Sequence, residues 1–319
     1  MSSINENSKI LVLGTGLIGS AFQRLFTGKN YKEVIAVNSH NVDLCDTNET
    51  INFFKKVKPD YVINAAGKVG GIIANRDHPA DFIVENLSIQ MNVIKAAHQV
   101  GIERLIFFAS SCMYPKEASQ PMKEDALLTG KPEETSMPYA ISKIAGMQLC
   151  LAFNQQFGIN KYIPVIPNSV YGPNDNFDPN SGHVLSSLIR RFHDAKENKI
   201  KELVLWGTGS PRREFIHSDD LARACFILLS EDYLEVDFPI NVGVSEDISI
   251  KDLAKIIAEI VGYEGKILWD KTKPDGAPRK LLESSRISSL GWTPLVTLKK
   301  GIHETYNWYK EKILKKDIE

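Results

Sequence analysis

The chain has 319 residues, of which 43% are hydrophobic and 24% are charged, and this ordinary globular composition excludes intrinsic disorder for most of its length. Lys and Arg number 38 against 39 Asp and Glu, a net charge of −1, so no excess of charge indicates a nucleic-acid or membrane-surface partner. Four cysteines are too few for a disulfide scaffold, no apolar run reaches the ~18 residues of a membrane span, and the polar start MSSINENSKI lacks a signal core. These features predict a cytoplasmic protein with free thiols.

Five short apolar runs, rich in β-branched and aromatic residues, follow one another through the first half of the chain. They are Ile10–Leu13, Val34–Val37, Tyr61–Asn64, Leu105–Ala109 and Tyr162–Ile166. None alternates polar with apolar residues, which is typical of strands buried on both faces. Segments with helical spacing lie between them, among them Glu49–Val57 and Asp81–Val100. We therefore expect an α/β fold with a doubly wound parallel sheet, as in a Rossmann fold.

The first strand runs into the sequence Gly14-Thr15-Gly16-Leu17-Ile18-Gly19, a G-x-G-x-x-G pattern that opens a helix. Glycines permit a tight turn and a close backbone approach, and the helix N-terminus offers free N–H groups to a pyrophosphate. At the first strand of an alternating α/β chain, this pattern favours a dinucleotide site over a merely structural turn.

The second strand ends at Asn38-Ser39-His40, without the acidic residue that binds the ribose 2′-hydroxyl of NAD. No carboxylate would repel a 2′-phosphate there, and His40 could help to bind one, which favours NADP. A solvated loop histidine explains His40 equally well. Asp43 follows shortly and could contact the adenine.

Tyr139 and Lys143 lie four residues apart, on one face of a helix that begins near Pro138. A neighbouring ammonium favours the phenolate, so we expect Lys143 to lower the pKa of Tyr139 and make it a usable acid and base. Y-x-x-x-K is common by chance, but Ser110-Ser111 stands at the end of the fourth strand, where a sheet presents groups to a cofactor. The glycine turn, the serine and the Tyr139–Lys143 pair, in this order along the chain, indicate a catalytic cofactor site more specifically than any one of these features alone.

The character of the chain changes after about residue 170. A loop rich in Pro, Gly and Asn, Tyr171–Gly182, precedes a basic helix over Val184–Lys196 and a short strand over Leu203–Trp206. We expect residues 1–170 to form the dinucleotide-binding domain and residues 171–319 to form mainly a smaller α/β substrate domain. One strand of the second segment is expected to return to the first sheet near Pro239–Val242.

These motifs together resemble the extended, sugar-nucleotide-modifying branch of the short-chain dehydrogenase/reductase superfamily, and longer strings resemble its GDP-L-fucose synthase family. The matches as a whole run from residue 10 to about residue 310, so the resemblance covers nearly the whole chain. The longer strings are Asn64–Ile72, Ser110–Pro115, Pro138–Lys143, Tyr171–Phe177, His183 with Leu188–His193, Trp206–Phe215 and Lys273–Lys280.

The resemblance implies an NADPH-dependent enzyme that epimerises C3 and C5 and reduces C4 of GDP-4-keto-6-deoxy-D-mannose, and it implies a homodimer. It assigns reduction to Ser110, Tyr139 and Lys143, epimerisation to Cys112 and His183, and GDP-sugar binding to Arg191, Trp206, Arg213 and Asp275. It assigns NADP(H) contacts to Gly14, Thr15, Gly16, Leu17, Ile18, Gly19, Asn38, Ser39, His40, Ala65, Phe108, Ala109, Ser111, Lys143, Pro167, Asn168, Ser169 and Val170.

The chemistry accounts for these residue types. Protons on C3 and C5 lie α to the C4 ketone, and inversion needs a base on one face of the sugar and an acid on the other. A Cys112 thiolate and a protonated His183 fit these roles, while Tyr139 and Ser110 would hold the C4 oxygen. A free cysteine is more often a small buried apolar residue, and this is our interpretation of Cys45, Cys150 and Cys225.

The sequence departs from the family pattern at three places. Leu13 stands where the extended branch has its first glycine, the end of the second strand lacks Arg or Lys, and Pro167-Asn168-Ser169 replaces the usual P-T-N. One alternative is a C4-reductase, with or without epimerisation, of a related GDP-4-keto sugar such as a heptose or a 3,6-dideoxy-hexose. Another is a non-catalytic member that senses a dinucleotide. The Cys and His spacings do not indicate a metal site.

Overall fold

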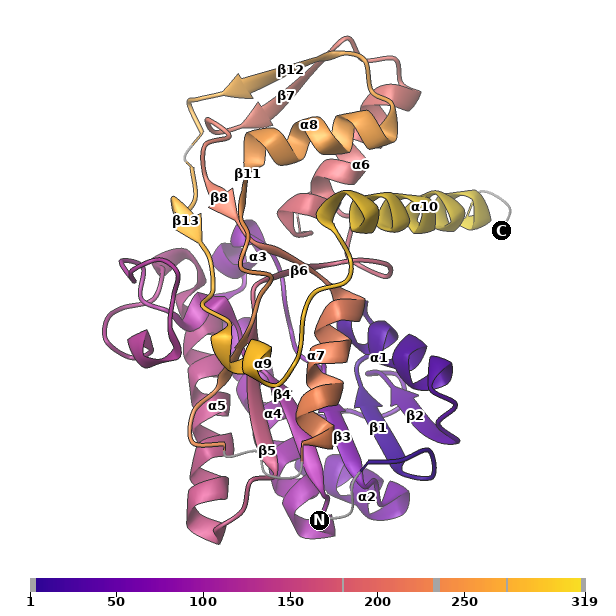
Figure 1. The fold of residues 1–319 in the computed structure, drawn as a ribbon, viewed down its shortest axis with the longest axis vertical. Coiled ribbons are helices and arrows are strands. Elements are labelled where there is room, and N and C mark those ends of the chain that lie inside the picture. The colour runs from indigo at the N-terminus through magenta and orange to yellow at the C-terminus, as the bar shows by residue number, and fades with distance from the viewer. Residues whose placement is uncertain (1–3, 180, 232–235, 274, 317–319) are drawn as a thin grey trace.

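The computed structural model describes residues 4–179, 181–231, 236–273 and 275–316. Pro274, inside the Lys273–Lys280 string, lies outside these ranges. Figure 1 shows a larger lobe built on a central sheet and a smaller lobe that contains α6, α8 and α10. Among the described helices, none has the length and apolar character needed to cross a bilayer.

Six parallel strands form the central sheet in the order β10-β5-β4-β3-β1-β2. They are β1 Lys9–Leu13, β2 Glu33–Val37, β3 Tyr61–Asn64, β4 Arg104–Phe108, β5 Tyr162–Pro167 and β10 Ile240–Val242. The first five coincide with the predicted apolar runs to within one residue at each end. The sixth comes from the second half of the chain and pairs Ile240 with Val165. The predicted doubly wound parallel sheet is confirmed.

Alternate residues of each strand face opposite layers of helices. In β1, Ile10 and Val12 pack with residues of α1 and α7, whereas Leu11 and Leu13 pack with residues of α2, α4 and α5. All four side chains are 0% exposed, which explains why the strands read as continuous apolar runs. The helices are α1 Leu17–Gly28, α2 Thr47–Val57, α4 Pro79–Val100, α5 Met137–Phe157 and α7 Ser218–Ser230.

The smaller lobe has its own core and its own short sheets. Phe192 of α6 and Ile257 of α8 are buried in one cluster with Ile302 of α10. Strand β7 pairs in parallel with β12, and β8 lies between β11 and β13. Its elements are α6 Val184–Glu197, β7 Glu202–Trp206, β8 Arg212–Arg213, β11 Ile248–Ser249, α8 Ile250–Val261, β12 Lys266–Asp270, β13 Arg279–Lys280 and α10 Leu298–Lys316.

Short elements connect the two lobes. Strands β6 and β9 pair with each other in parallel, and η1 follows directly on β4. The remaining elements are α3 Ile72–Asp77, η1 Ser111–Met113, η2 Glu124–Ala126, η3 Glu134–Ser136, β6 Ser169–Tyr171, β9 Phe215–His217 and α9 Ser285–Ser289.

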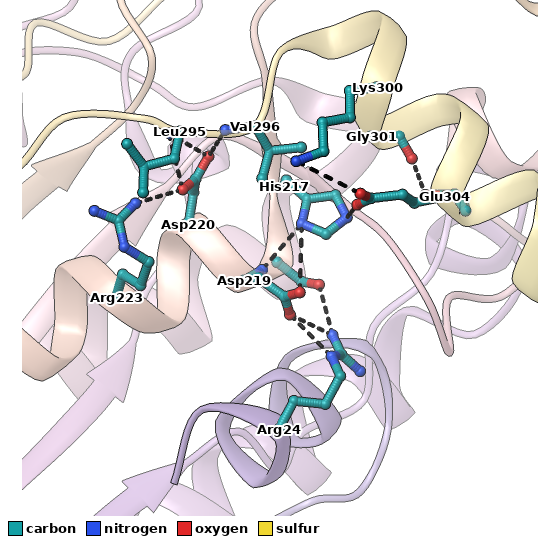
Figure 2. Close-up of polar contacts among 12 residues, drawn as sticks. Arg24, His217, Asp219, Asp220, Arg223, Leu295, Val296, Lys300, Gly301 and Glu304 are labelled. Carbon is teal, nitrogen blue, oxygen red and sulfur yellow. Dashed lines mark hydrogen bonds and ion pairs between the residues drawn. The ribbon is translucent and has the colours of Figure 1, made fainter. Parts of the chain in front are cut away.

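A polar cluster lies where the lobes meet (Figure 2). His217 is 2% exposed at the end of β9, and its Nδ1 accepts a hydrogen bond from the Asp219 backbone at 3.3 Å. Arg24 of α1 pairs with the Asp219 carboxylate at 2.5 Å, and Glu304 of α10 lies 3.9 Å from His217 Nε2. The Arg24–Asp219 pair thus links α1 to α7 directly, and the buried His217 ring lies between Asp219 and Glu304 of α10.

Candidate active site

The glycine turn lies at the carboxyl end of β1, between β2 on one side and β3 on the other. Such a reversal of strand order is where open α/β sheets bind ligands. Gly14 has φ +94°, and a Cβ there would lie 2.8 Å from the Ala65 carbonyl oxygen after β3. A Cβ at Gly19 would collide with the carbonyl of Gly14. Backbone packing therefore requires both glycines.

Gly16 differs, because a Cβ at this position would meet no protein atom within 4 Å. It is the N-cap of α1, and no side chain caps that helix. The first N–H groups of α1 thus face open space and are suited to an anion. Asn38 donates to Thr15 Oγ1 at 3.4 Å, and Asn174 donates to the Thr15 carbonyl at 3.3 Å. This turn fits the pyrophosphate of a dinucleotide.

The end of β2 lies beside this turn, since the Gly14 backbone N–H donates to the Val37 carbonyl at 2.8 Å. Ser39 and His40 are exposed, and the His40 backbone donates to Asn38 Oδ1 at 2.9 Å. The Asp43 carboxylate accepts from the Cys45 backbone at 2.8 Å. The exposed His40 ring fits the predicted phosphate contact, whereas Asp43 stabilises its own turn.

Lys143 is buried on α5, and its ammonium donates to the Phe108 carbonyl at 2.9 Å, at the end of β4. Burial lowers the pKa of Lys143 to about 8. The same face of α5 carries Tyr139, as the four-residue spacing predicts, but Lys143 Nζ is 5.8 Å from the centre of the Tyr139 ring. The two side chains are neighbours without a direct ion pair.

The prediction that Lys143 lowers the pKa of Tyr139 is wrong. Burial raises the pKa of Tyr139 above its ordinary value, the nearby Cys112 thiolate raises it further, and a hydrogen bond with Ser110 lowers it. The reason is that Lys143 directs its ammonium to the Phe108 carbonyl and not to the phenol. Tyr139 is therefore held as a protonated phenol.

Ser110 and Cys112 meet Tyr139 at the carboxyl end of β4. The Ser110 hydroxyl accepts a hydrogen bond from the Cys112 backbone at 3.2 Å and also contacts the Tyr139 side chain. Lys280 of β13 donates a hydrogen bond from Nζ to the sulfur of the half-buried Cys112, at 3.8 Å. Burial disfavours the Cys112 thiolate, but Lys280 and hydrogen bonds from Ser110 and Ser136 prevail and hold the thiol pKa below its ordinary value.

His183, the predicted acid, belongs to the smaller lobe, where it is the N-cap residue of α6. Its Nδ1 lies 3.9 Å from Asp175 Oδ1, and the Asp175 side chain is 3% exposed against 49% for His183. Contact with Asp175 raises the pKa of His183, against the opposite effect of burial. Within the described residues, no hydrogen bond joins His183 to Cys112 or Tyr139.

Two predicted cofactor residues use their side chains inside the fold. The Ser111 hydroxyl donates to Asn168 Oδ1 at 3.1 Å, and Asn168 Nδ2 donates to Glu214 and to the Lys280 carbonyl, both at 3.0 Å. Glu214 is fully buried, and burial raises the pKa of its carboxyl. Ser111 and Asn168 thus anchor β13 near Cys112, and their contact with NADP(H) stays a prediction.

The four predicted GDP-sugar residues lie in the smaller lobe. Arg191 of α6 donates to the Val204 carbonyl of β7 at 2.5 Å. Trp206 ends β7 with 60% of its surface exposed, and the Asp275 carboxylate accepts from the Thr208 hydroxyl at 2.6 Å just beyond it. The fourth residue, Arg213 of β8, donates to the Ala277 carbonyl at 2.7 Å. Burial lowers the pKa of Arg213, and the Cys112 thiolate counteracts part of this effect. In the β8–β13 pair, Arg213 lies opposite Lys280.

Sequence reasoning missed Lys280 and Asp175. Lys280 is the last residue of the Lys273–Lys280 string, and Asp175 lies within Tyr171–Phe177. Both residues therefore belong to strings that carry the family resemblance, but neither was assigned a function. Lys280 also lines a small pocket beside Cys112, together with Gln120 and Glu133. Across the described ranges, no group of three or more His, Cys, Asp or Glu side chains could hold a metal ion.

Comparisons with known proteins match nearly the whole chain. The NAD dependent epimerase/dehydratase family matches residues 10–243. GDP-L-fucose synthase 1 of Arabidopsis thaliana is 49% identical over 315 residues, 98% of this chain and 97% of the relative. A GDP-6-OMe-4-keto-L-xylo-heptose reductase from C. jejuni superposes with a TM-score of 0.90 at 33% identity, over 98% of this chain and 100% of that one. A GDP-L-fucose synthetase from Naegleria fowleri bound to NADP gives 0.91 at 28% identity, over 98% and 96%.

Proposed function

This chain belongs to the GDP-L-fucose synthase group of the NAD dependent epimerase/dehydratase family, and we propose that it converts GDP-4-keto-6-deoxy-D-mannose to GDP-L-fucose with NADPH. The reaction inverts C3 and C5 and reduces the C4 ketone. One observation carries the proposal. Ser110, Cys112 and Tyr139 lie together at the end of β4. Lys280 Nζ contacts the Cys112 sulfur. A thiolate base therefore lies beside two hydroxyl groups that can bind the C4 oxygen of the sugar.

NADPH, when bound, supplies the hydride that reduces C4. The chain would hold its pyrophosphate at the N-terminus of α1, where Gly16 leaves the backbone open. The exposed His40 lies at the end of β2, where a 2′-phosphate is expected. Lys143 would lie beside the nicotinamide end, since its ammonium is fixed at the end of β4.

Epimerisation follows from the acidity of C–H bonds next to a ketone. The Cys112 thiolate removes the proton from C3 or C5, and Lys280 and Ser110 keep the sulfur ionised for this step. His183 delivers a proton to the other face of the same carbon, because Asp175 favours its protonated form. Ser110 and Tyr139 donate hydrogen bonds to the C4 oxygen while it carries the enolate charge.

Reduction of C4 needs a proton donor, and burial keeps the Tyr139 phenol in its protonated form. Tyr139 stays protonated at neutral pH, since burial and the Cys112 thiolate both raise its pKa. A protonated phenol can give its proton to the C4 oxygen as hydride reaches the carbon. The Lys143 ammonium, 5.8 Å from the centre of the Tyr139 ring, would stabilise the phenolate that remains until solvent restores its proton.

The two lobes have separate tasks in this proposal. Residues 1–170, with the strand that returns near 239–242, form the cofactor domain, and residues 171–319 form mainly the domain for the GDP-sugar. Arg213 would pair with the diphosphate, since it lies opposite Lys280 in the β8–β13 pair and Lys280 contacts the Cys112 sulfur. The exposed Trp206 would stack on the guanine, with Asp275 and Arg191 at the same end of the lobe.

We also propose a homodimer formed through α4 and α5. These two helices pack side by side and carry exposed apolar side chains at Val84 (60%), Met91 (43%) and Ile141 (42%), which a second copy would cover. Sedimentation of the unmodified protein should give twice the mass of one chain, and Met91→Lys should lower the measured mass toward that of a single chain.

We also propose a cytoplasmic location, because the Cys112 thiol must stay reduced to act as a base.

The second candidate is a C4-reductase of a related GDP-4-keto sugar. The C. jejuni heptose reductase, which superposes with a TM-score of 0.90, favours it. Product analysis distinguishes the two. The purified enzyme should turn over GDP-4-keto-6-deoxy-D-mannose with a higher kcat/KM than a GDP-4-keto-heptose, and the product should be GDP-L-fucose. A higher kcat/KM for the heptose would replace the first candidate by the second.

A further inference from the structure

The buried carboxylate of Asp175 lies beside the exposed ring of His183, the predicted acid of the epimerisation. The Asp175 side chain is 3% exposed and His183 is 49% exposed, and Nδ1 of the ring lies 3.9 Å from Asp175 Oδ1. The Nδ1 edge of the ring therefore faces the interior. Because Nε2 is on the opposite edge of an imidazole, it faces outward.

The Asp175 carboxylate is fixed before it meets the ring. Its Oδ1 accepts the Asn176 backbone N–H at 2.8 Å, and its Oδ2 accepts the Ser186 hydroxyl from the first turn of α6. The backbone of His183 is also fixed, since its carbonyl accepts the Ser187 N–H at 2.9 Å. Its ring makes no hydrogen bond to the helix as a cap, so the ring is available to Asp175.

We propose that Asp175 is a positioning residue that holds His183 through Nδ1, so that Nε2 carries the proton it donates to the sugar, a role that rests on the proposed function. In each inversion the C–H proton passes to the Cys112 sulfur, the proton on Nε2 forms the new C–H bond, and water restores both groups. The neutral ring that remains keeps its Nδ1–H toward Asp175. Nε2 is then free to take a proton from solvent.

The surrounding charges make Asp175 necessary for this role. His183 lies at the N-terminus of α6, where the helix dipole disfavours a cation. On the same helix, Arg190 and Arg191 lie about two turns farther along. Asp178, in the preceding loop, binds Ser181 through its carboxylate. Within the described residues, Asp175 is the charged group that acts on the His183 ring and raises its pKa.

The test is a 15N NMR titration of histidine side chains in the free enzyme, with His183 assigned from His183→Gln. Asp175→Asn should lower the His183 pKa, whereas Asp194→Asn, farther along α6, should leave it unchanged, since Asp194 pairs with Arg190. An unchanged His183 pKa in Asp175→Asn would overturn the proposal. This readout needs no substrate, so a wrong assignment of the sugar would not affect it.

Two further measurements keep the proposal testable if Asp175→Asn folds poorly. In the unmodified enzyme, the 15N shifts of neutral His183 should show the proton on Nδ1, and a proton on Nε2 would overturn the proposal. In D2O with substrate, Asp175→Asn should lose deuterium incorporation at pH 8 roughly tenfold for each pH unit by which the His183 pKa falls. The rate of deuterium incorporation should also begin to fall at a lower pH in Asp175→Asn than in the unmodified enzyme. If this alkaline limb of the profile stayed at the same pH, Asp175 would have a structural role only.

Discussion

Lys280 Nζ lies 3.8 Å from the Cys112 sulfur, and this contact joins β13 of the smaller lobe to the end of β4 in the larger one. The ammonium counteracts the burial that would keep the thiol protonated. The base of the proposed epimerisation is thus completed only when the two lobes are in register. The buried Asn168 side chain maintains this register, because it binds both Ser111 and the Lys280 carbonyl.

Lys280→Met should make Cys112 a weaker base. The Cys112 pKa should rise, so at a pH below that pKa the alkylation of this thiol by iodoacetamide should slow by up to about tenfold for a rise of about one pH unit. The measurement is the alkylation rate against pH in a Cys45→Ser background, since Cys45 is exposed. Lys255→Met is the matched control, because Lys255 pairs with Asp252 on the surface. An unchanged rate for Lys280→Met would mean that Lys280 does not support the thiolate.

Tyr139→Phe should abolish reduction and spare cofactor binding. Loss of the proton donor should lower turnover by about 10²–10⁴-fold, while the Kd for NADPH, measured by fluorescence, should stay near the unmodified value. Tyr31→Phe is the control, since the Tyr31 ring packs against Phe26 in the core, away from the site. Retained turnover in Tyr139→Phe would assign proton donation to another group.

Gly16→Ala should weaken NADPH binding without weakening the fold. A Cβ at Gly16 meets no protein atom within 4 Å, and φ is −73° there, so the free energy of unfolding should change little. The methyl group would occupy the space next to the helix N-terminus, and the Kd for NADPH should rise about tenfold or more. Gly28→Ala at the other end of α1 also meets no atom within 4 Å and should leave the Kd for NADPH unchanged. An unaltered Kd in Gly16→Ala would place the pyrophosphate elsewhere.

His217 should make the fold sensitive to mild acid. Burial lowers the pKa of His217 despite Asp219 and Glu304 nearby, so the unfolded chain binds a proton more readily than the folded one. Stability should therefore fall as pH drops below the ordinary histidine value of about 6.5, by at most about 1.4 kcal/mol per pH unit from this ring. Urea unfolding from pH 7.5 to 5.5 measures it.

The matched variants for this test are His217→Asn and His303→Asn. The asparagine oxygen can replace Nδ1 as acceptor for the Asp219 backbone without titrating, so His217→Asn should flatten the pH dependence. His303 is exposed on α10, and its replacement should leave the slope unchanged. An equal slope in all three proteins would contradict a role for His217.

The sequence predicted the larger lobe well because its signals are local. Strands β1 to β5 are buried on both faces, so each reads as an apolar run, and the ends of β1 and β4 locate the glycine turn and Ser110. The contact between Lys280 and Cys112 spans 168 residues, and β8, β11 and β13 are too short to show a period. The four-residue spacing placed Tyr139 and Lys143 on one face of α5 but could not foresee that Phe108 binds the ammonium.

In the proposed function, one site both inverts C3 and C5 and reduces C4. The most direct measurement is a reaction in D2O with GDP-4-keto-6-deoxy-D-mannose and NADPH, in which NADPH oxidation is followed and product deuterium is located by NMR. We expect oxidation of NADPH and deuterium at both C3 and C5. Oxidation with neither carbon labelled would contradict it, and would leave a C4-reductase in which Cys112 and His183 do not act on this sugar.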